Sequence, residues 1–321
     1  MRIILSRTDS IGDVVLTLPM AGVLKQQFPG CYIIFLGRKY TRPVIEACMH
    51  VDLFVDWDEV AGELAWLQAD VIIHVFPVKA ICRAARQARI PLRIATAGRL
   101  FSWFTCNRLP YIPRKDSRLH ESQLNLKLLA PLGINCDFAL SEIPSYYGLS
   151  TAGLPCLFTG IPDDSTLKTV VLHPRSKGSA REWGLENFGR LISLLPADKF
   201  NLVVTGTQAE GESMRAFLDE HLNRITDLTG RLTLPEFLGL IGSCYALVAA
   251  STGPLHLAAA LGKRAIGLYA PMRPIFPTRW APLGTKATWL VLDKICSDCR
   301  KTNDCKCIRS IKPEDVAALL N

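Results

Sequence analysis

The sequence predicts an α/β protein made of two doubly wound domains that face a cleft. Short, continuous apolar runs alternate with segments of helical periodicity in both halves of the 321-residue chain. Such runs are typical of strands that are buried on both faces of a parallel sheet. Between the halves, residues 143–165 lose this periodicity and collect three prolines and three glycines, as a linker does. We therefore expect one domain at residues 1–160 and a second at residues 161–321.

The first half begins with the apolar run Arg2–Leu5, which is followed by a polar turn and a helical stretch from about Asp13 to Phe28. Later apolar runs predict the remaining strands of this half at Cys31–Leu36, Leu53–Val55, Val71–Val75 and Leu92–Ala95. Helical periodicity predicts helices near Arg42–Met49, Val60–Gln68, Val78–Ala88 and Ser117–Leu132.

The same alternation restarts after the linker. Apolar runs predict strands at Thr169–His173, Asn201–Thr205, Ile225–Leu228, Ala246–Ala250 and Ala265–Tyr269. Helical periodicity predicts helices at Leu185–Leu195, Glu210–Leu222, Leu234–Ile241, Pro254–Leu261 and Pro313–Leu320. Ligands of open α/β sheets bind beyond the carboxyl ends of the strands, so we expect the chemistry in the turns that follow strands.

The composition argues against several classes of protein. With 49% hydrophobic and 21% charged residues, the chain is too apolar to stay disordered, and no internal repeat indicates a solenoid. No apolar run reaches membrane-spanning length, and the opening run meets Ser6 and Arg7 too early for a signal peptide. Eleven cysteines, an odd number, indicate a reducing compartment. The net charge of +8 indicates an anionic partner.

The turn after the first strand, residues 6–13, contains the first candidate site. Gly12 permits the close approach of a ligand, and Asp13 is expected in the first turn of the following helix. A carboxylate there either complements the positive end of the helix dipole or serves as the base for an incoming hydroxyl group. Spacing alone leaves both interpretations open.

Two turns of the second half have the features of phosphate sites. Residues 173–183 follow a strand and combine glycine and serine with the three cations Arg175, Lys177 and Arg181. Backbone N–H groups and cations can share the charge of a phosphate, although the segment lacks the ending of a Walker loop, and a solvated basic loop is the alternative. Residues 251–256 open an alanine-rich helix with Pro254 in its first turn, where exposed N–H groups suit a diphosphate.

A basic segment spans residues 71–115, which contain nine basic residues and no acidic one. Four apolar residues lie in its middle, namely Leu100, Phe101, Trp103 and Phe104. A basic face flanked by apolar side chains suits an anionic amphiphile at a membrane surface. Nucleic acid is the rival ligand, but no recognisable nucleic-acid-binding module accompanies the charge. An ordinary solvated helix face is the third interpretation.

Four cysteines gather near the end of the chain, at Cys296, Cys299, Cys305 and Cys307. The group suggests a metal knuckle, but its Cys-x-Cys ending departs from the paired spacings of zinc ribbons. Reduced structural thiols are favoured over a zinc site, with metal binding and disulfide pairing left open.

Together these residues resemble the bacterial lipopolysaccharide heptosyltransferases, the inverting glycosyltransferases of family 9. The resemblance covers nearly the whole chain, and the order and spacing of its motifs make it specific. It rests on residues 10–19, 173–183, 228–231 and 251–262, on the late cysteines, and on the ending at residues 311–316.

The resemblance implies a GT-B glycosyltransferase fold of two Rossmann-like domains, with the last helix crossing back onto the first domain. It implies that the second domain holds ADP-heptose and that the first holds the Kdo and heptose inner core of lipopolysaccharide, as Kdo-lipid A or a later core intermediate. No cofactor or metal is expected in the catalytic step, and no nucleic acid as a partner. The expected location is cytoplasmic, with peripheral contact at the inner face of the inner membrane.

The resemblance also implies roles for individual residues. Asp13 would be the catalytic base, and Lys177 and Arg181 would stabilise charge on the departing ADP. Donor contacts are implied for Ser176, Gly178, Thr205, Glu210, Ser251, Thr252, Gly253, Pro254 and His256. Acceptor contacts are implied for Gly12, Arg83, Arg86 and Arg118. Glu210 would accept hydrogen bonds from a ribose, and simple capping of the next helix is its alternative role.

The chain departs from the family pattern at two positions. Arg181 stands where well-studied members carry lysine, which keeps the charge but presents a planar fork. Ser251 stands where several members carry aspartate. A carboxylate that could accept a hydrogen bond from a sugar hydroxyl is therefore missing, and the identity of the nucleotide sugar stays open. Two other functions also stay open: a sugar-nucleotide epimerase or hydrolase of the same fold, and a non-catalytic basic protein that binds anions.

Overall fold

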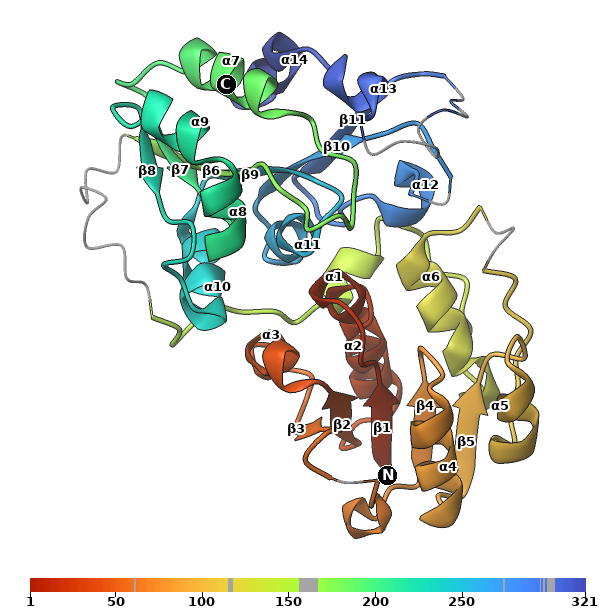
Figure 1. Ribbon diagram of the computed structural model, residues 1–321. Helices are drawn as coiled ribbons and strands as arrows, with labels where there is room; N and C mark the ends of the chain where they lie inside the picture. The colour runs from red at the N-terminus through yellow and green to blue at the C-terminus, as the bar shows by residue number, and fades with distance from the viewer. Residues whose placement is uncertain are drawn as a thin grey trace. The chain divides into compact units, whose positions relative to one another are not determined.

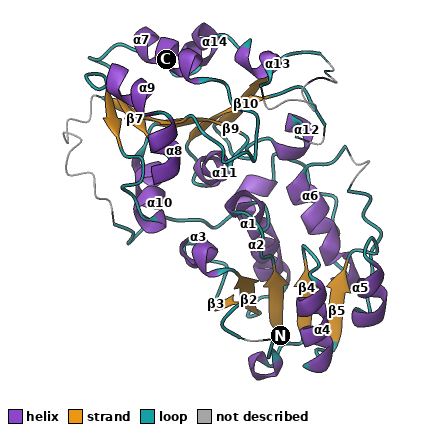
Figure 2. Ribbon diagram, in the orientation of Figure 1, coloured by secondary structure: helices purple, strands orange, loops and turns teal. Residues whose placement is uncertain are grey.

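The computed structural model describes residues 1–60, 62–114, 118–155, 167–273, 275–294, 296, 298 and 304–321. The chain divides into two compact units, Met1–Ser150 and Thr151–Asn321. Each unit contains a parallel sheet accompanied by helices, which Figure 2 distinguishes by colour. The predicted α/β class with two doubly wound sheets is therefore confirmed. The second half of the predicted linker lies outside the described residues from residue 156 onward.

The first unit has a parallel sheet in the order β3-β2-β1-β4-β5 (Figure 1). Its strands are β1 (Arg2–Ser6), β2 (Tyr32–Gly37), β3 (Leu53–Asp56), β4 (Val71–His74) and β5 (Leu92–Ala95). Its α-helices are α1 (Ile11–Val15), α2 (Leu18–Gln27), α3 (Arg42–Glu46), α4 (Lys79–Gln87), α5 (Leu100–Thr105) and α6 (Glu121–Leu126). The strand order reverses between β1 and β4, where Ser6 pairs in register with His74. Such a switch point is where open α/β sheets bind ligands.

Three predicted helices of this unit differ from the observed ones. The helix predicted from Asp13 to Phe28 is two helices, because the chain turns at Leu16 and Thr17 before Pro19 opens α2. The helix predicted at Val60–Gln68 is wrong: the described part of that range holds only the 3-10 turn η2 (Ala65–Leu67). Buried Leu64 and Leu67 have a spacing that both kinds of helix satisfy.

The third difference concerns the helix predicted at Ser117–Leu132. Helix α6 begins only at Glu121, where the ring of His120 caps it by accepting a hydrogen bond from the Ser122 N–H. The chain then continues as the 3-10 turn η3 (Lys127–Leu132), which contains Pro131. A further 3-10 turn, η4 (Ile143–Tyr146), packs on α2. Gly22 permits this contact, since a Cβ there would lie 2.3 Å from the Tyr146 carbonyl oxygen.

The second unit has a parallel sheet in the order β11-β10-β9-β6-β7-β8. Its strands are β6 (Lys168–His173), β7 (Phe200–Val204), β8 (Ile225–Asp227), β9 (Ala246–Ala250), β10 (Arg264–Tyr269) and β11 (Ala287–Val291). Its helices are α7 (Leu185–Leu194), α8 (Gln208–Ser213), α9 (Arg215–Glu220), α10 (Leu234–Ser243), α11 (Gly253–Ala260), α12 (Pro277–Trp280), α13 (Lys306–Arg309) and α14 (Pro313–Ala318). Here the strand order reverses between β6 and β9.

The second unit differs from its prediction at β11, at the short helices α12 and α13, for which no element was predicted, and at the α8–α9 pair. Strand β11 lies at the edge of the sheet with Trp289 45% exposed, so it lacks the buried apolar run that marks the central strands. The single helix predicted at Glu210–Leu222 is broken at Met214, whose φ of −123° is not helical. Met214 is buried there.

The closing segment of the chain packs on α7. Helix α14 contacts α7, and Val316, Ala317 and Leu320 join the apolar core of the second unit. Trp183, buried at the start of α7, donates from its indole Nε1 to the Ile311 carbonyl oxygen at 2.9 Å. The apolar face of α14 is thus used within its own unit. Among the described residues, no helix is both long enough and apolar enough to cross a membrane.

Candidate active site

Asp13 lies at the switch point of the first unit, in the first turn of α1 after the end of β1. The Ser10 hydroxyl donates to Oδ2 of Asp13 at 2.6 Å, and the Asp13 N–H donates back to Ser10 Oγ at 3.4 Å. Ser10 is therefore the N-cap of α1. The Asp13 side chain remains 20% exposed, so a solute can reach a carboxylate whose orientation is held from two sides.

Arg7 is the second residue that contacts the Asp13 carboxylate, and its role was not predicted from the sequence. Its side chain is only 3% exposed, and its Nη2 donates to Oδ1 of Asp13. The same guanidinium lies 2.6 Å from Asp9 and 3.7 Å from Glu121. Burial opposes the charge, but these three carboxylates outweigh it and raise the pKa of Arg7 above its ordinary value. Arg7 thus stays a cation beside the Asp13 carboxylate.

A ring of polar groups supports Arg7 in turn. Arg114 donates to Glu121, and its Nη2 donates to Oδ1 of Asn125 at 2.9 Å. Burial, together with the neighbouring charge of Asp13, raises the pKa of Asp9 despite its contact with Arg7. Gly12 lies in the buried first turn of α1, where its carbonyl accepts the Leu16 N–H at 3.0 Å. One sequence feature could have indicated the role of Arg7, because a cation directly follows the buried strand β1 at this position.

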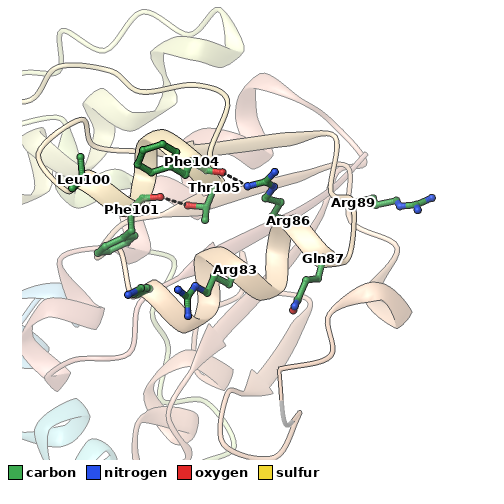
Figure 3. A pocket seen from close by; sticks show the side chains of 9 residues that line it. Arg83, Arg86, Gln87, Arg89, Leu100, Phe101, Phe104 and Thr105 are labelled. Atoms are coloured by element: carbon green, nitrogen blue, oxygen red, sulfur yellow. Dashed lines mark hydrogen bonds between the residues drawn. The ribbon is translucent and has the colours of Figure 1, made fainter.

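The basic segment forms a pocket in the first unit (Figure 3). The pocket has a volume of about 800 Å³ and lies between α4 and α5. It is lined by Lys79, Arg83, Arg86, Gln87, Arg89, Leu100, Phe101, Phe104 and Thr105. Arg86 Nη1 donates to the Phe104 carbonyl oxygen at 2.6 Å, which joins the two helices. Leu100 and Phe104 are 77% and 67% exposed, so this wall is basic and apolar at once.

The structure sorts the predicted acceptor residues into separate places. Arg83 and Arg86 line the α4–α5 pocket, whereas Arg118 is exposed just before α6 and does not line it. Arg93 belongs to the basic segment but holds the fold, because its side chain donates to the carbonyl oxygens of Ile90 and Thr105. Lys115 lies outside the described residues.

The loop after β6 is the first half of the switch point in the second unit. Glu182 closes this loop by accepting the Ser176 N–H at 3.0 Å and pairing with Arg175 at 2.9 Å. The buried Ser176 hydroxyl bonds Ala180 and Glu182 and so serves the loop itself. Lys177 and Gly178 follow with φ values of +49° and +77°, and both are exposed. Backbone N–H groups in a turn can point toward an anion, and a non-glycine residue at such a φ marks a strained position.

The second half of this switch point is the turn between β9 and α11. Thr252 is the N-cap of α11 by backbone conformation, but its side chain makes no capping bond. Within the described part of the chain its buried Oγ1 has no hydrogen-bond partner, so the Thr252 side chain does not cap the first N–H groups of α11, and such uncapped groups can bind an anion. Arg181 and Ser251 line one small hollow together with residues of β10. The structure therefore brings Arg181 to the turn that begins α11.

The remaining predicted donor residues have structural partners. Thr205 Oγ1 lies 3.0 Å from Nδ1 of His173, and burial lowers the pKa of this histidine to about 4. Glu210 forms a capping box, accepting the Thr207 N–H at 2.7 Å and the Thr207 hydroxyl at 2.9 Å. His256 is buried in α11. Of the late cysteines, Cys305 and Cys307 are buried and Cys296 is half-buried, while Cys299 lies outside the described residues.

Known proteins share this fold and this sequence pattern. Residues 77–308 match glycosyltransferase family 9 (heptosyltransferase). A putative glycosyltransferase of Haemophilus influenzae is 26% identical over 301 residues, which cover 88% of this chain and 86% of the relative.

Solved structures extend the likeness of fold over the whole chain. The Escherichia coli ADP-heptose LPS heptosyltransferase II has a TM-score of 0.75 at 19% identity, covering 100% of this chain and 98% of the other. The E. coli heptosyltransferase WaaC with ADP also has a TM-score of 0.75, at 16% identity and with 100% and 99% covered. The family match extends over more than half of the sequence, and the chain therefore belongs to glycosyltransferase family 9, the heptosyltransferases.

Proposed function

We propose that this chain transfers a heptose from ADP-heptose to the Kdo and heptose inner core of lipopolysaccharide, with inversion at the anomeric carbon. The observation that carries the proposal is the carboxylate of Asp13, held by Ser10 and Arg7 at the switch point of the first unit. Two proteins of similar structure support the choice of donor. One is an ADP-heptose LPS heptosyltransferase, and the other is a heptosyltransferase bound to ADP.

The proposed reaction is a single displacement. An acceptor hydroxyl oxygen attacks the anomeric carbon while the bond from that carbon to the β-phosphate oxygen breaks, and its electron pair leaves with ADP. Asp13 takes the hydroxyl proton during the attack, as a general base does. Arg7 and Ser10 are positioning residues, because they contact Asp13 and fix the direction of its oxygens. A base fixed in this way needs no reorganisation as the proton moves.

The second unit would bind the nucleotide diphosphate. The N–H groups at the start of α11, which the Thr252 side chain does not cap, and the turn at Lys177 and Gly178 both suit phosphate oxygens. Arg181 shares the hollow beside α11 with Ser251, and exposed Lys177 adds a second cation. These charges would stabilise the negative charge that develops on the departing ADP. We propose that they do so without a metal in the catalytic step.

The α4–α5 pocket would receive the anionic acceptor. Arg83 and Arg86 suit the carboxylates of Kdo and the phosphates of lipid A, and exposed Leu100, Trp103 and Phe104 suit the edge of a lipid layer. The protein would then work peripherally at the cytoplasmic face of the inner membrane, where a basic surface is attracted to anionic lipid.

Mass spectrometry of the acceptor tests this function. The protein is incubated with ADP-heptose, with and without Kdo-lipid A, in the presence of chelator. We expect the acceptor to gain the mass of one heptose, with an equal amount of ADP released only when acceptor is present. Turnover of ADP-heptose at the same rate without acceptor would contradict the proposal and indicate an epimerase or hydrolase.

A further inference from the structure

A cluster of metal-ligating side chains lies in the first unit, apart from the residues used above. His74 ends β4, Cys82 lies in α4, and Cys106 directly follows α5. A ring nitrogen of His74 and the sulfur atoms of Cys82 and Cys106 all lie within 4.8 Å of one another. His74 and Cys82 are fully buried, and Cys106 is 8% exposed. We call these three residues the β4–α4–α5 triad.

His74 carries the second observation. Across the described part of the chain, neither Nδ1 nor Nε2 of its buried ring has a hydrogen-bond partner. A neutral imidazole has one N–H donor and one acceptor nitrogen, and each buried group left unsatisfied costs about 1–3 kcal/mol. Most buried polar side chains have a partner, and the two cysteine sulfur atoms lie within 4.8 Å of this ring, so the three groups together suit a ligand that nitrogen and sulfur both bind.

We propose that His74, Cys82 and Cys106 bind one zinc ion. Zinc takes thiolate sulfur at about 2.3 Å and imidazole nitrogen at about 2.0–2.1 Å, so side-chain movements of about an ångström close the triad around the ion. Binding releases the two thiol protons to solvent. The two thiolates then neutralise the charge of the ion, which makes its burial among apolar side chains tolerable. A fourth ligand position is left for a water molecule.

Three protein ligands and a water are the set of an open zinc site, but the apolar surroundings of the triad indicate that this ion would hold the fold and not meet a substrate. Ala95 is buried against the two cysteines, and Phe101 and Leu109 pack on the same cluster. The ion would join β4, α4 and α5, of which α4 and α5 form the walls of the basic pocket in Figure 3. Thr105, which lines that pocket, immediately precedes Cys106. Zinc would therefore fix the wall that the proposed acceptor contacts, while taking no part in the transfer itself.

Metal content of purified protein tests the site. The whole chain is purified under reducing conditions without chelator, and zinc is measured by mass spectrometry for the wild type, His74→Gln, Cys82→Ser and Cys106→Ser. Cys31→Ser is the matched control, since Cys31 is also a buried thiol of the first unit but lies outside the triad. Each triad variant should hold about one zinc fewer per chain than the wild type, whereas Cys31→Ser should not. Because each variant is compared with the wild type, any zinc bound by the late cysteines is present in both and does not affect the difference.

A measurement on the unaltered chain covers the case in which a triad variant fails to fold. Wild-type protein, freed of metal and then incubated with or without zinc, is alkylated slowly and each cysteine is quantified by peptide mass spectrometry. Zinc should reduce the labelling of Cys82 and Cys106 at least about tenfold and leave that of Cys31 unchanged. Equal labelling with and without zinc would overturn the proposal. A Cys82–Cys106 disulfide in freshly prepared protein without zinc would also overturn it, and would make the pair a redox site.

Discussion

Arg7 and Asp13 form an ion pair in which Nη2 of the buried guanidinium donates to Oδ1 of the carboxylate, while the Ser10 hydroxyl holds the other oxygen at 2.6 Å. The pair stands at the carboxyl end of β1, beside β4. A carboxylate bound through both oxygens is well ordered but remains an acceptor for one more proton. The orientation of the Asp13 carboxylate is thus fixed from two sides, as its proposed role as a base requires.

Arg7 should be needed both for folding and for catalysis, and two substitutions separate the effects. Arg7→Met leaves Asp9, Asp13 and Glu121 without their shared cation, which should destabilise the protein by about 3–5 kcal/mol. Arg7→Lys keeps the charge but not the planar fork, so it should fold while kcat falls by roughly tenfold. Urea unfolding and acceptor-dependent ADP release check the two effects. A fully active Arg7→Lys would show that the direction of the Asp13 oxygens is unimportant.

Lys177 offers a way to remove a charge without straining the backbone. Its φ of +49° disfavours any side chain, so Lys177→Gly should keep or raise the melting temperature. If the ammonium group stabilises the departing diphosphate, kcat should nevertheless fall by about a hundredfold. Thermal unfolding and initial rates are compared in the same preparation. Unchanged kcat would remove Lys177 from the proposed catalytic group.

Arg83 should act on the acceptor and leave the chemistry alone. Arg83→Gln removes one cation from the pocket wall, worth about 1 kcal/mol near an anionic surface, so KM for Kdo-lipid A should rise about fivefold with kcat unchanged. Lys39→Gln is the control, because Lys39 is an exposed cation of the same unit that pairs with Glu59 at 3.6 Å outside the pocket. Equal KM values for both variants would exclude the pocket as the acceptor site.

The half-buried His173 should make stability fall in mild acid. Its pKa is lowered to about 4 by burial, while that of an unfolded histidine is about 6.5. The unfolded state therefore binds the extra proton first, so the stability is complete above about pH 6.5 and is lost as the pH falls toward 4. His173→Gln should flatten this part of the profile, as urea unfolding at several pH values can show. An unchanged slope in the variant would assign the loss to other groups.

Buried apolar runs predicted the central strands well, because β1, β4, β6 and β9 are apolar on both faces. Peripheral elements were harder. The partly exposed β11 carries no such run, and the missed α5 exposes Leu100, Trp103 and Phe104 instead of burying one stripe. The 3-10 turn at Ala65–Leu67 is predicted as part of a helix because buried Leu64 and Leu67 have a spacing that both kinds of helix satisfy.

The candidate site was predictable only where its residues are near in sequence. Asp13 and the segments 173–183 and 251–256 follow strands directly, and the topology places each at a switch point. The ion pair of Arg7 with Glu121 and the proximity of His74 to Cys106 involve residues far apart in the chain. Only the folded sheet brings these groups together, so no local pattern could have indicated them. The contact of Glu182 with the Ser176 N–H could have been predicted from the sequence, because the two residues are only six positions apart.

The rate of acceptor-dependent ADP release by Asp13→Asn tests the central claim most directly. The amide is equal in size and can still contact Arg7 through its oxygen, but it cannot accept the proton. Asp58→Asn is the matched control, since Asp58 also pairs with an arginine, Arg38, at 3.2 Å in the same unit. The account predicts that Asp13→Asn folds and binds ADP-heptose while kcat drops by roughly a thousandfold, with Asp58→Asn unaffected. An Asp13→Asn variant that keeps most of its kcat would contradict the account.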